Sequence, residues 1–449
     1  MSNERFKKES RKIKGKSVAP PAVVPDNPRI ASMKPPDKPC TYDEWQAVIK
    51  ANFPDLLFSA ELCLSVISQI LITDITNPFA LVLVDVPSAG KTITLNFFAG
   101  IEQLSYPTDK FTPASFVSNA ANVSKAKLAA VDLLPRVKNK VLIVRDLATI
   151  FSKREEDLKE LLGILTRVLD GEGLRTESGV HGDRHYDGQY LLMFLAASTP
   201  VRPVVWKTMG NLGARLFFLN MNSKNMSIDE LADQLGSTTA MDKEHVCREV
   251  TERIAQTLWA QNPDGVIWDS DRDDRELKKI IGQCAQLLAC LRGVVNIDNE
   301  YGSNGKLETS NVTASVEKAW RINQLLYNLC RGHALACGRR QLNKDDVRVA
   351  IELAMDSAPT TRTILLRHLF ENDGELLTKQ VENLLNCTAP TAAKEMRIFK
   401  SLGLCNLIQE SNGNVGEPPM KLSVKDDFRW FMSDECRAIR LLEPINKED

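Results

Sequence analysis

The chain has 449 residues, of which 43% are hydrophobic and 26% are charged, and its formal net charge is -1. This length predicts more than one domain. The balanced charge argues against a protein wrapped in nucleic acid over its whole surface, but it permits a local basic patch. No apolar run approaches the ~20 residues of a membrane helix, and no apolar secretory segment lies near the N-terminus. These features predict a cytoplasmic protein without membrane contact.

The first 40 residues predict a disordered tail, because the basic run "ERFKKESRKIKGK" precedes proline-rich stretches. Order is expected to begin at Thr41, whose side chain can form a capping box with Glu44 at the start of a helix. The ten cysteines form no C-x-x-C pair. Their scatter predicts reduced thiols rather than a zinc site.

Apolar runs then alternate with helical patterns up to about residue 222. Because the runs are mostly continuous rather than alternating, they predict an α/β fold with a parallel sheet buried on both faces. The expected strands are Phe79–Val84, Ala114–Val117, Val141–Val144, Leu191–Ala197 and Leu216–Met221. The pattern from 223 to 358 predicts helices, with loops over 264–275 and 296–306. The predicted organisation is a tail at 1–40, a core at 41–222, a helical lid at 223–358 and a winged-helix domain at 359–449.

The stretch "FALVLVDVPSAGKT" places a loop ending in Gly-Lys-Thr between a strand and a helix. This is the layout of a phosphate-binding P-loop, in which main-chain amides and a helix N-terminus face the phosphates. Lys91 would reach the β- and γ-phosphates of ATP, and the hydroxyl of Thr92 would bind Mg²⁺. The expected nucleotide-binding residues are Pro87, Ser88, Ala89, Gly90, Lys91 and Thr92. Asp85 stands where the usual pattern begins with glycine; aspartate tolerates unusual backbone angles, but its charge near phosphates is unfavourable.

Further polar residues downstream of this loop are candidates for a nucleotide site. Asp146 ends the apolar strand in "KVLIVRDL" and is a candidate Mg²⁺ ligand, although Leu147 stands where a glutamate usually follows. Ser198 and Thr199 end another apolar strand, where ligands bind in α/β sheets. Two arginines complete the set, each of which could instead form a surface ion pair: Arg215 between a helix and a strand, and Arg321 near a helix start.

In this order the motifs resemble those of the AAA+ ATPases, over about residues 42 to 358. The resemblance implies Lys91 and Thr92 as ATP and Mg²⁺ ligands, and Asp146 as the Walker-B acid. It implies Thr199 or Ser198 as sensor 1, Arg215 as the arginine finger of a neighbouring subunit and Arg321 as sensor 2. It also implies a homo-oligomer, as a ring or partial ring. The departures at Asp85 and Leu147 place the rate of hydrolysis in question more than binding.

The glycine-rich segment "DGEGLRTESGVHGDRHYDGQY" predicts a β-hairpin, although a solvated loop is the alternative. It resembles the helix-2 insert of minichromosome-maintenance helicases and enhancer-binding activators. In such a ring the hairpin would offer charged and aromatic side chains to a nucleic-acid strand. These side chains are Arg175, His181, Arg184, His185 and Tyr186. A metal site at the two histidines is disfavoured because no third ligand is near.

The C-terminal region predicts a winged helix, with helices at Thr361–Phe370, Thr378–Leu385 and Thr391–Leu402 and a wing across "SNGNVGEPP". Lys394, Arg397 and Lys400 follow one another at three-residue steps on the third helix, so one face of it is basic. In a helix-turn-helix this helix enters the DNA major groove. The order of core, lid and winged helix resembles the origin-recognition and minichromosome-maintenance proteins. Many winged helices instead bind proteins, so a protein partner is the alternative.

Three functions fit these patterns. The first is an oligomeric, Mg²⁺-dependent ATPase that acts on DNA, as a helicase-like motor or remodeller in replication, recombination or defence. The second is a slow nucleotide switch that controls assembly of a partner, which the missing glutamate favours. The third is a non-enzymatic winged-helix regulator that binds DNA and carries a degenerate P-loop, which Asp85 favours.

Overall fold

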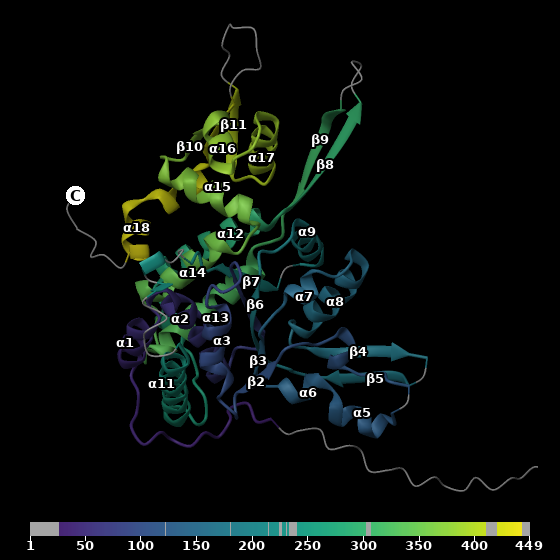
Figure 1. The fold of residues 1–449 in the computed structure, drawn as a ribbon, viewed down its shortest axis with the longest axis vertical. Coiled ribbons are helices and arrows are strands. Elements are labelled where there is room, and N and C mark those ends of the chain that lie inside the picture. The colour runs from purple at the N-terminus through teal and green to yellow at the C-terminus, as the bar shows by residue number, and fades with distance from the viewer. Residues whose placement is uncertain are drawn as a thin grey trace, which may run out of the picture.

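The computed structural model describes residues 27–121, 123–179, 181–213, 215–223, 227–229, 231–232, 240–301, 307–409 and 420–441. A five-stranded parallel sheet, in the order β2-β3-β6-β1-β7, lies at its centre (Figure 1). Its strands are β1 (Phe79–Val84), β2 (Ser105–Thr108), β3 (Val141–Val144), β6 (Met193–Ser198) and β7 (Leu216–Asn220). The predicted α/β fold with a parallel sheet is confirmed.

Both faces of the sheet are covered by helices, as the apolar runs predict. Along β1, Phe79, Leu81 and Leu83 face one hydrophobic cluster, while Ala80, Val82 and Val84 face a second. This alternation explains why all six residues of the strand are buried. The helices that surround the sheet are α1 (Tyr42–Asn52), α2 (Leu57–Ser68), α3 (Lys91–Ala99), α4 (Pro113–Phe116), α5 (Lys125–Val131), α6 (Leu133–Val137), α7 (Ala148–Phe151), α8 (Glu155–Val168) and α9 (Pro203–Leu212).

Short 3-10 turns η1 (Pro54–Leu56) and η2 (Gln69–Leu71) flank α2. The stretch Pro54–Leu71 is long and apolar enough to cross a membrane by composition, but 78% of it is buried inside the molecule. It is therefore a core helix of this fold. The capping box predicted at Thr41 and Glu44 is present at the start of α1.

The predicted strand Ala114–Val117 is wrong. Thr112 and Ser115 form a capping box and Pro113 occupies the first turn, so the segment forms α4. The strand in this region is β2, whose sequence SYPT is only partly buried. Proline is tolerated there because β2 is an edge strand.

The predicted disordered tail is also wrong over residues 27–40. Within residues 27–40, Met33 and Cys40 are buried, and the amide of Asn27 donates hydrogen bonds to the carbonyls of Pro135 and Arg136. Arg29 donates to the carbonyls of residues 72 and 75. The basic run of residues 4–16 lies outside the described residues.

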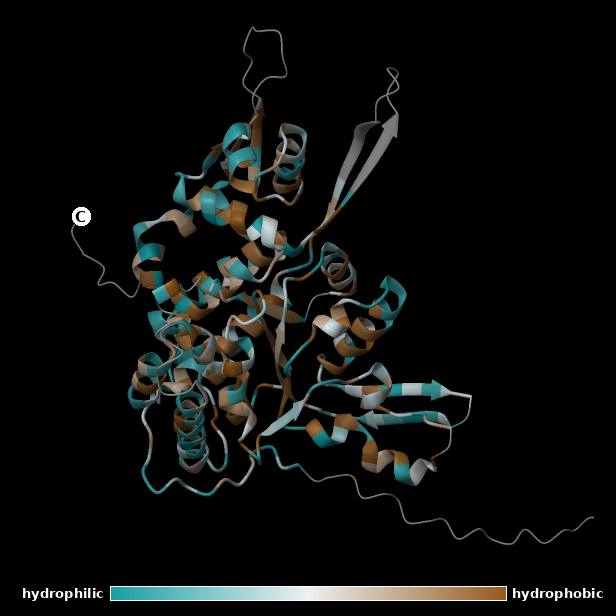
Figure 2. Ribbon diagram, viewed as in Figure 1, coloured by the Kyte–Doolittle hydropathy of each residue, from teal (hydrophilic) through white to brown (hydrophobic). Residues whose placement is uncertain are grey.

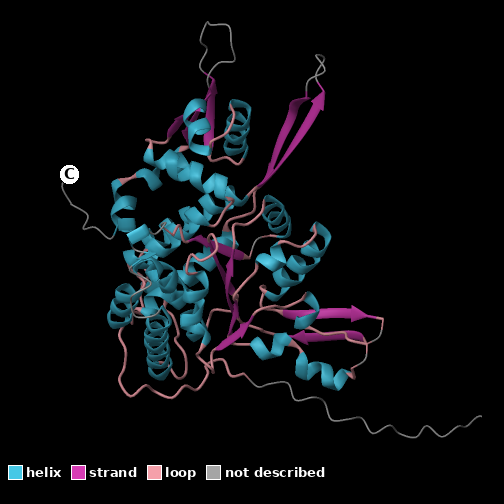
Figure 3. Ribbon diagram, viewed as in Figure 1, coloured by secondary structure: helices cyan, strands magenta, loops and turns pink. Residues whose placement is uncertain are grey.

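The segment from 240 to 358 contains helices, as predicted, and a hairpin that the sequence did not indicate. The helices are α11 (Ala240–Gln261), η3 (Ser270–Arg272), α12 (Arg275–Arg292), α13 (Trp320–Ala336) and α14 (Lys344–Asp356). The hairpin consists of β8 (Val294–Tyr301) and β9 (Leu307–Ser315), which lie between α12 and α13 in the chain. It projects from the body of the molecule (Figure 3). A loop was predicted over 296–306; residues 296–301 belong to β8 instead, and 302–306 lie outside the described residues.

The C-terminal segment has the elements predicted for a winged helix. They are α15 (Thr360–Glu371), β10 (Glu375–Leu377), α16 (Thr378–Leu385), α17 (Ala389–Ser401), β11 (Cys405–Gln409) and β12 (Met420–Val424). The strands form an antiparallel sheet in the order β10-β12-β11. The tip of the predicted wing, 410–419, lies outside the described residues. A 3-10 helix, η4 (Asp426–Met432), and α18 (Asp434–Leu441) follow.

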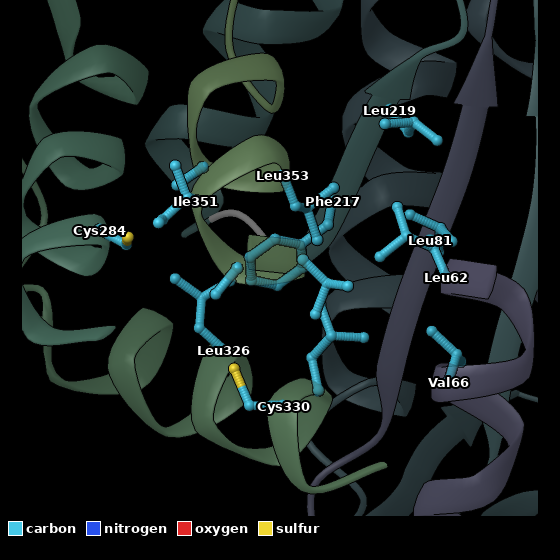
Figure 4. Packing of buried hydrophobic residues seen from close by; sticks show 14 of the residues in the cluster. Leu62, Val66, Leu81, Phe217, Leu219, Cys284, Leu326, Cys330, Ile351 and Leu353 are labelled. Atoms are coloured by element: carbon cyan, nitrogen blue, oxygen red, sulfur yellow. The ribbon is translucent and has the colours of Figure 1, made fainter. Parts of the chain in front are cut away.

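One hydrophobic cluster runs through all three segments, from Trp45 through Leu326 to Phe399. Figure 4 shows its centre, where side chains of α2, β1, β7, α12, α13 and α14 meet. Hydropathy colouring shows that most strands of the sheet are apolar, while the helices carry both apolar and polar residues (Figure 2). The predicted domain boundaries at 222 and 358 therefore separate sequence segments that share one core.

Candidate nucleotide site

The loop between β1 and α3 has the geometry expected of an anion-binding turn. Gly90 caps α3 with φ 82° and Ser88 has φ 67°, so both lie in the left-handed region. A Cβ atom on Gly90 would lie 2.7 Å from a methyl carbon of Leu56, so a larger residue would also displace that side chain. Among the described residues, the amides of Ser88, Ala89 and Gly90 donate no hydrogen bond. Unpaired amides at a helix N-terminus are suited to a phosphate. Pro87 has no amide hydrogen and can contribute only its ring.

Lys91 is 8% exposed and turns back onto its own loop. Its ammonium donates to the carbonyl oxygens of Asp85 at 2.8 Å and Val86 at 2.5 Å. Burial lowers the pKa of Lys91, while the charges of Asp85 and Asp146 act to raise it. A buried ammonium held only by carbonyls can exchange them for phosphate oxygens at little cost.

Asp85 has a structural role that the sequence did not reveal. Its carboxylate accepts hydrogen bonds from the amides of Val86, at 2.7 Å, and Ser223, at 2.9 Å. Asp85 is not among the residues with positive φ, so tolerance of unusual backbone angles is not why aspartate is found here. Instead its side chain ties the loop to the segment that follows β7.

The other polar candidates lie, like the loop, at the carboxyl ends of the parallel strands. Val84 is paired with Ser198 on one side and Asn220 on the other, and Asp146 follows β3 by two residues. Asp146 and Thr92 are both exposed, and the charge of Asp146 acts to raise the pKa of Lys91. Asp146 accepts a hydrogen bond from the amide of Ala148 at 2.7 Å. A carboxylate and a hydroxyl of this kind are ligands that Mg²⁺ prefers.

The position after Asp146 and one of the two sensor candidates are both buried. Leu147 is 1% exposed and belongs to the core, so it supplies no base. Glu155 starts α8 and forms an ion pair with Lys159 at 2.9 Å. Ser198 is buried and its hydroxyl donates to the carbonyl of Thr199. Thr199 is the more accessible of the two sensor candidates.

Arg215 and Arg321 lie together at the end of the sheet opposite the loop 85–91, where the parallel strands begin. Arg215 immediately precedes β7, which runs parallel to β1, so about 15 Å of strand separates it from the loop edge. The Nη1 atoms of both arginines lie beside Gly213. Arg215 is ion-paired with Asp170 at 2.9 Å, and its side chain is 10% exposed. The structure therefore does not bring either arginine together with Lys91 within the chain.

The predicted hairpin is present as β4 (Gly173–Ser178) and β5 (Gly182–Asp187). The expectation that Arg184 faces DNA is contradicted, because Arg184 is 8% exposed and bonds to buried Asp132. The hydroxyl of Tyr186 also donates to Asp132, at 2.7 Å, so both side chains fasten the hairpin to the core.

Of the remaining hairpin residues, His181 contacts the carbonyl of Ala120. Arg175 is exposed, but it lies between Asp183 at 3.7 Å and Asp187 at 3.8 Å. His185 contacts the same two carboxylates. The exposed face is thus more acidic than the sequence predicted.

The basic face of α17 is present as predicted by spacing. Lys394, Arg397 and Lys400 are all exposed, and none of them forms an ion pair in the part of the chain that the structure describes. Apolar residues of α17, including Met396 and Phe399, are buried on the other side.

The fold and this site define a parallel α/β core with a P-loop-like turn after strand β1. No protein-family model matches the chain, and no curated protein matches it. Among solved structures it is similar to the apo C-terminal region of NrS-1, at 12% identity and TM-score 0.31, with 88% of this chain and 78% of that chain covered. It is also similar to a full-length MCM homologue from Methanopyrus kandleri, at 13% identity and TM-score 0.38, covering 70% of this chain and 58% of that one. Neither likeness assigns the chain to a family.

Proposed function

We propose that this protein binds ATP at the loop 85–91 and hydrolyses it as an oligomer that acts on DNA. The observation that supports the proposal most is the loop itself, which brings three unpaired amides and a buried lysine to the carboxyl edge of a parallel sheet. Ligands bind at this edge in open α/β sheets.

The residues have distinct roles in this proposal. The amides of 88–90 and the ammonium of Lys91 hold the phosphates, while Thr92 and Asp146 hold Mg²⁺. When bound, the Mg²⁺ ion offsets the charge that develops on the phosphate oxygens. Thr199 would orient the attacked phosphate. Arg215 and Arg321, which lie far from their own loop, would complete the site of a neighbouring subunit.

DNA contact is proposed for α17. Its three exposed cations, Lys394, Arg397 and Lys400, lack ion-pair partners among the described residues, whereas Arg175 of the hairpin is neutralised by two aspartates. We also propose that residues 223–358 form the helical lid of the ATPase and that residues 359–449 form its winged-helix domain. A slow nucleotide switch remains the second candidate, because buried Leu147 leaves no carboxylate beside Asp146 to activate water.

The proposal is tested by steady-state ATP turnover of the wild type, Lys91→Ala and Asp146→Asn, each with and without duplex DNA. We expect turnover that needs both residues and rises with DNA. Replacing the three α17 cations by glutamine should reduce DNA affinity and lower its salt slope by about 0.9 for each phosphate that is no longer neutralised. Turnover that survives Lys91→Ala would refute an ATPase at this loop, and turnover that is slow and insensitive to DNA would favour the switch.

A further inference from the structure

A second candidate site lies outside the loop edge, where the three segments meet. A cavity of about 480 Å³ is bounded by α9, the start of β8, the start of α15 and α17. Figure 1 shows α9 and α15 on either side of the base of β8. A cavity of this size is within the range of small-molecule sites.

The wall of the cavity contains a buried positive charge without a counter-ion. Arg292 is 6% exposed, and its guanidinium donates to the carbonyls of Ser357 and Leu216. Its Nη1 atom is buried and has no hydrogen-bond partner, and no carboxylate lies within 4.0 Å of it in the described chain. Burial lowers the pKa of Arg292 to about 10, and the charge of Glu317 acts against this shift. A buried charge in such a position is costly unless something pairs with it.

A second arginine, half-buried, lines the same cavity. Arg362 donates to the carbonyls of Leu291 and Gly293, at 2.6 and 2.7 Å, and it too has no carboxylate within 4.0 Å among the described residues. The exposed Lys207 adds a third positive charge to the lining, and Glu395 provides one negative charge. Burial raises the pKa of Glu395, against the influence of Arg362 and Lys394. The cavity is therefore positive overall.

The N-terminus of α15 lies at the same cavity as these positive charges. No side chain caps the helix, and the amides of Thr360 and Thr361 donate no hydrogen bond in the described part of the molecule. Both residues line the cavity. Trp206, on the opposite wall, has a buried ring nitrogen without a partner. The free donors thus come from a helix terminus, a guanidinium and an indole, and all of them favour an anion.

We propose that this cavity binds a phosphate group, carried either by a free nucleotide or by a nucleic-acid strand. The unpaired Nη1 of Arg292 and the α15 amides would hold the phosphate oxygens, and Lys207 would add charge at the mouth. Trp206 would pack against the rest of the ligand. The site requires neither the loop 85–91 nor ATP hydrolysis.

The test uses the full-length chain with Lys91→Ala, so that anion binding at the loop is weakened. Pyrophosphate binding is measured by calorimetry, and the melting temperature is compared with that in chloride at equal ionic strength. We expect binding and a higher melting temperature in pyrophosphate. Lys207→Gln and Arg362→Gln should each weaken binding about fivefold or more, because each removes a positive charge from the lining. Arg429→Gln, an exposed arginine of η4 paired with Asp426, is the matched control.

Because Arg362 also supports the turn before β8, Lys207→Gln is the variant that decides if Arg362→Gln fails to fold. Competition then identifies the source of the phosphate. Displacement by ADP assigns a nucleotide, displacement by a short single-stranded oligonucleotide alone assigns nucleic acid, and displacement by neither assigns a bare phosphate compound. The proposal is overturned if pyrophosphate acts no differently from chloride, or if Lys207→Gln binds it as tightly as Arg429→Gln does.

Discussion

Asp85 shows how a residue can look wrong in a motif and still be explained by its contacts. The sequence placed a negative charge beside the expected phosphates. In the structure, the two carboxylate oxygens are occupied by the amides of Val86 and Ser223. The loop thus gains an attachment to the segment after β7 that glycine could not provide.

We expect Asp85→Asn to change nucleotide affinity and stability in opposite directions. Removing a like charge near the triphosphate should tighten ATP binding by about threefold to tenfold. Loss of one amide hydrogen bond should lower the free energy of unfolding by about 1 kcal/mol. Calorimetry and urea denaturation measure the two effects, with exposed Asp43→Asn as the control. Weaker ATP binding would instead indicate that this carboxylate helps to hold the metal ion.

His333 is a buried residue whose charge should be visible in the pH dependence of stability. Its ring contacts Asp346 at 2.6 Å and Glu61 at 2.9 Å, joining α13 to α14 and α2. Burial acts to lower the pKa of His333, but hydrogen bonds to Asp346, Cys337 and Glu61 raise it well above 6.5. Burial acts to raise the pKa of Glu61, but its bonds to His333 and Arg348 lower it to about 2.

A raised histidine pKa stabilises the fold below the unfolded value and loses that effect as the pH rises through the folded value. A lowered carboxyl pKa stabilises above the unfolded value and loses that effect as the pH falls. His333→Gln should therefore cost most, about 3 kcal/mol, between pH 4.5 and 6.5, and less on either side. Urea denaturation from about pH 3 to about pH 9 measures this. A cost that does not vary with pH would contradict a charged imidazole.

At the scale of elements, the β4–β5 hairpin depends on one buried carboxylate. Asp132 accepts hydrogen bonds from Arg184, from Tyr186 and from the amide of Ser118. Because removing one partner leaves the buried arginine unpaired, Asp132→Asn should lower the free energy of unfolding by about 3 kcal/mol. Asp183→Asn, on the exposed face of the same hairpin, should cost less than about 1 kcal/mol.

A double variant separates the ion pair from the packing around it. Combining Asp132→Asn with Arg184→Met should cost less than the sum of the two single changes, because no unpaired charge remains. If the two costs add, Asp132 does not hold the hairpin through Arg184.

Elements with a strong period or cap were predictable, and elements decided by distant contacts were not. β1, β3 and α16 follow from apolar runs and helical spacing, and their bounds agree with the prediction. β2 and β8 were missed because polar residues and proline carry no strand signal without their partners. In the site, Lys91 and Asp146 followed from motif order. The burial of Arg184 and the tie from Asp85 to Ser223 depend on residues far away in sequence, so no local pattern could reveal them.

At the scale of the whole molecule, the proposed ATPase site requires residues of two chains. Arg321 lies with Arg215 at the sheet edge opposite the loop. As the candidate sensor 2, Arg321 would stabilise charge in the transition state, so we expect Arg321→Ala to bind ATP normally but to lose ~100-fold or more in turnover. Lys91→Ala should lose ATP affinity in addition to turnover.

Mixing the two inactive variants tests the subunit arrangement. In a random oligomer, about a quarter of the interfaces would join an intact Lys91 to an intact Arg321 across subunits. Turnover of the mixture should then exceed that of either variant alone. If the mixture remains as inactive as its components, Arg321 does not act on a neighbour.

The most direct measurement is the affinity of the full-length protein for ATP, with and without Mg²⁺, by calorimetry on the wild type and Lys91→Ala. Binding to the wild type should require Mg²⁺ for full strength and weaken ~10-fold or more in the variant, because alanine has no ammonium to hold the phosphates. Equal affinity in the two proteins, or no binding by the wild type, would contradict a triphosphate held by the loop 85–91.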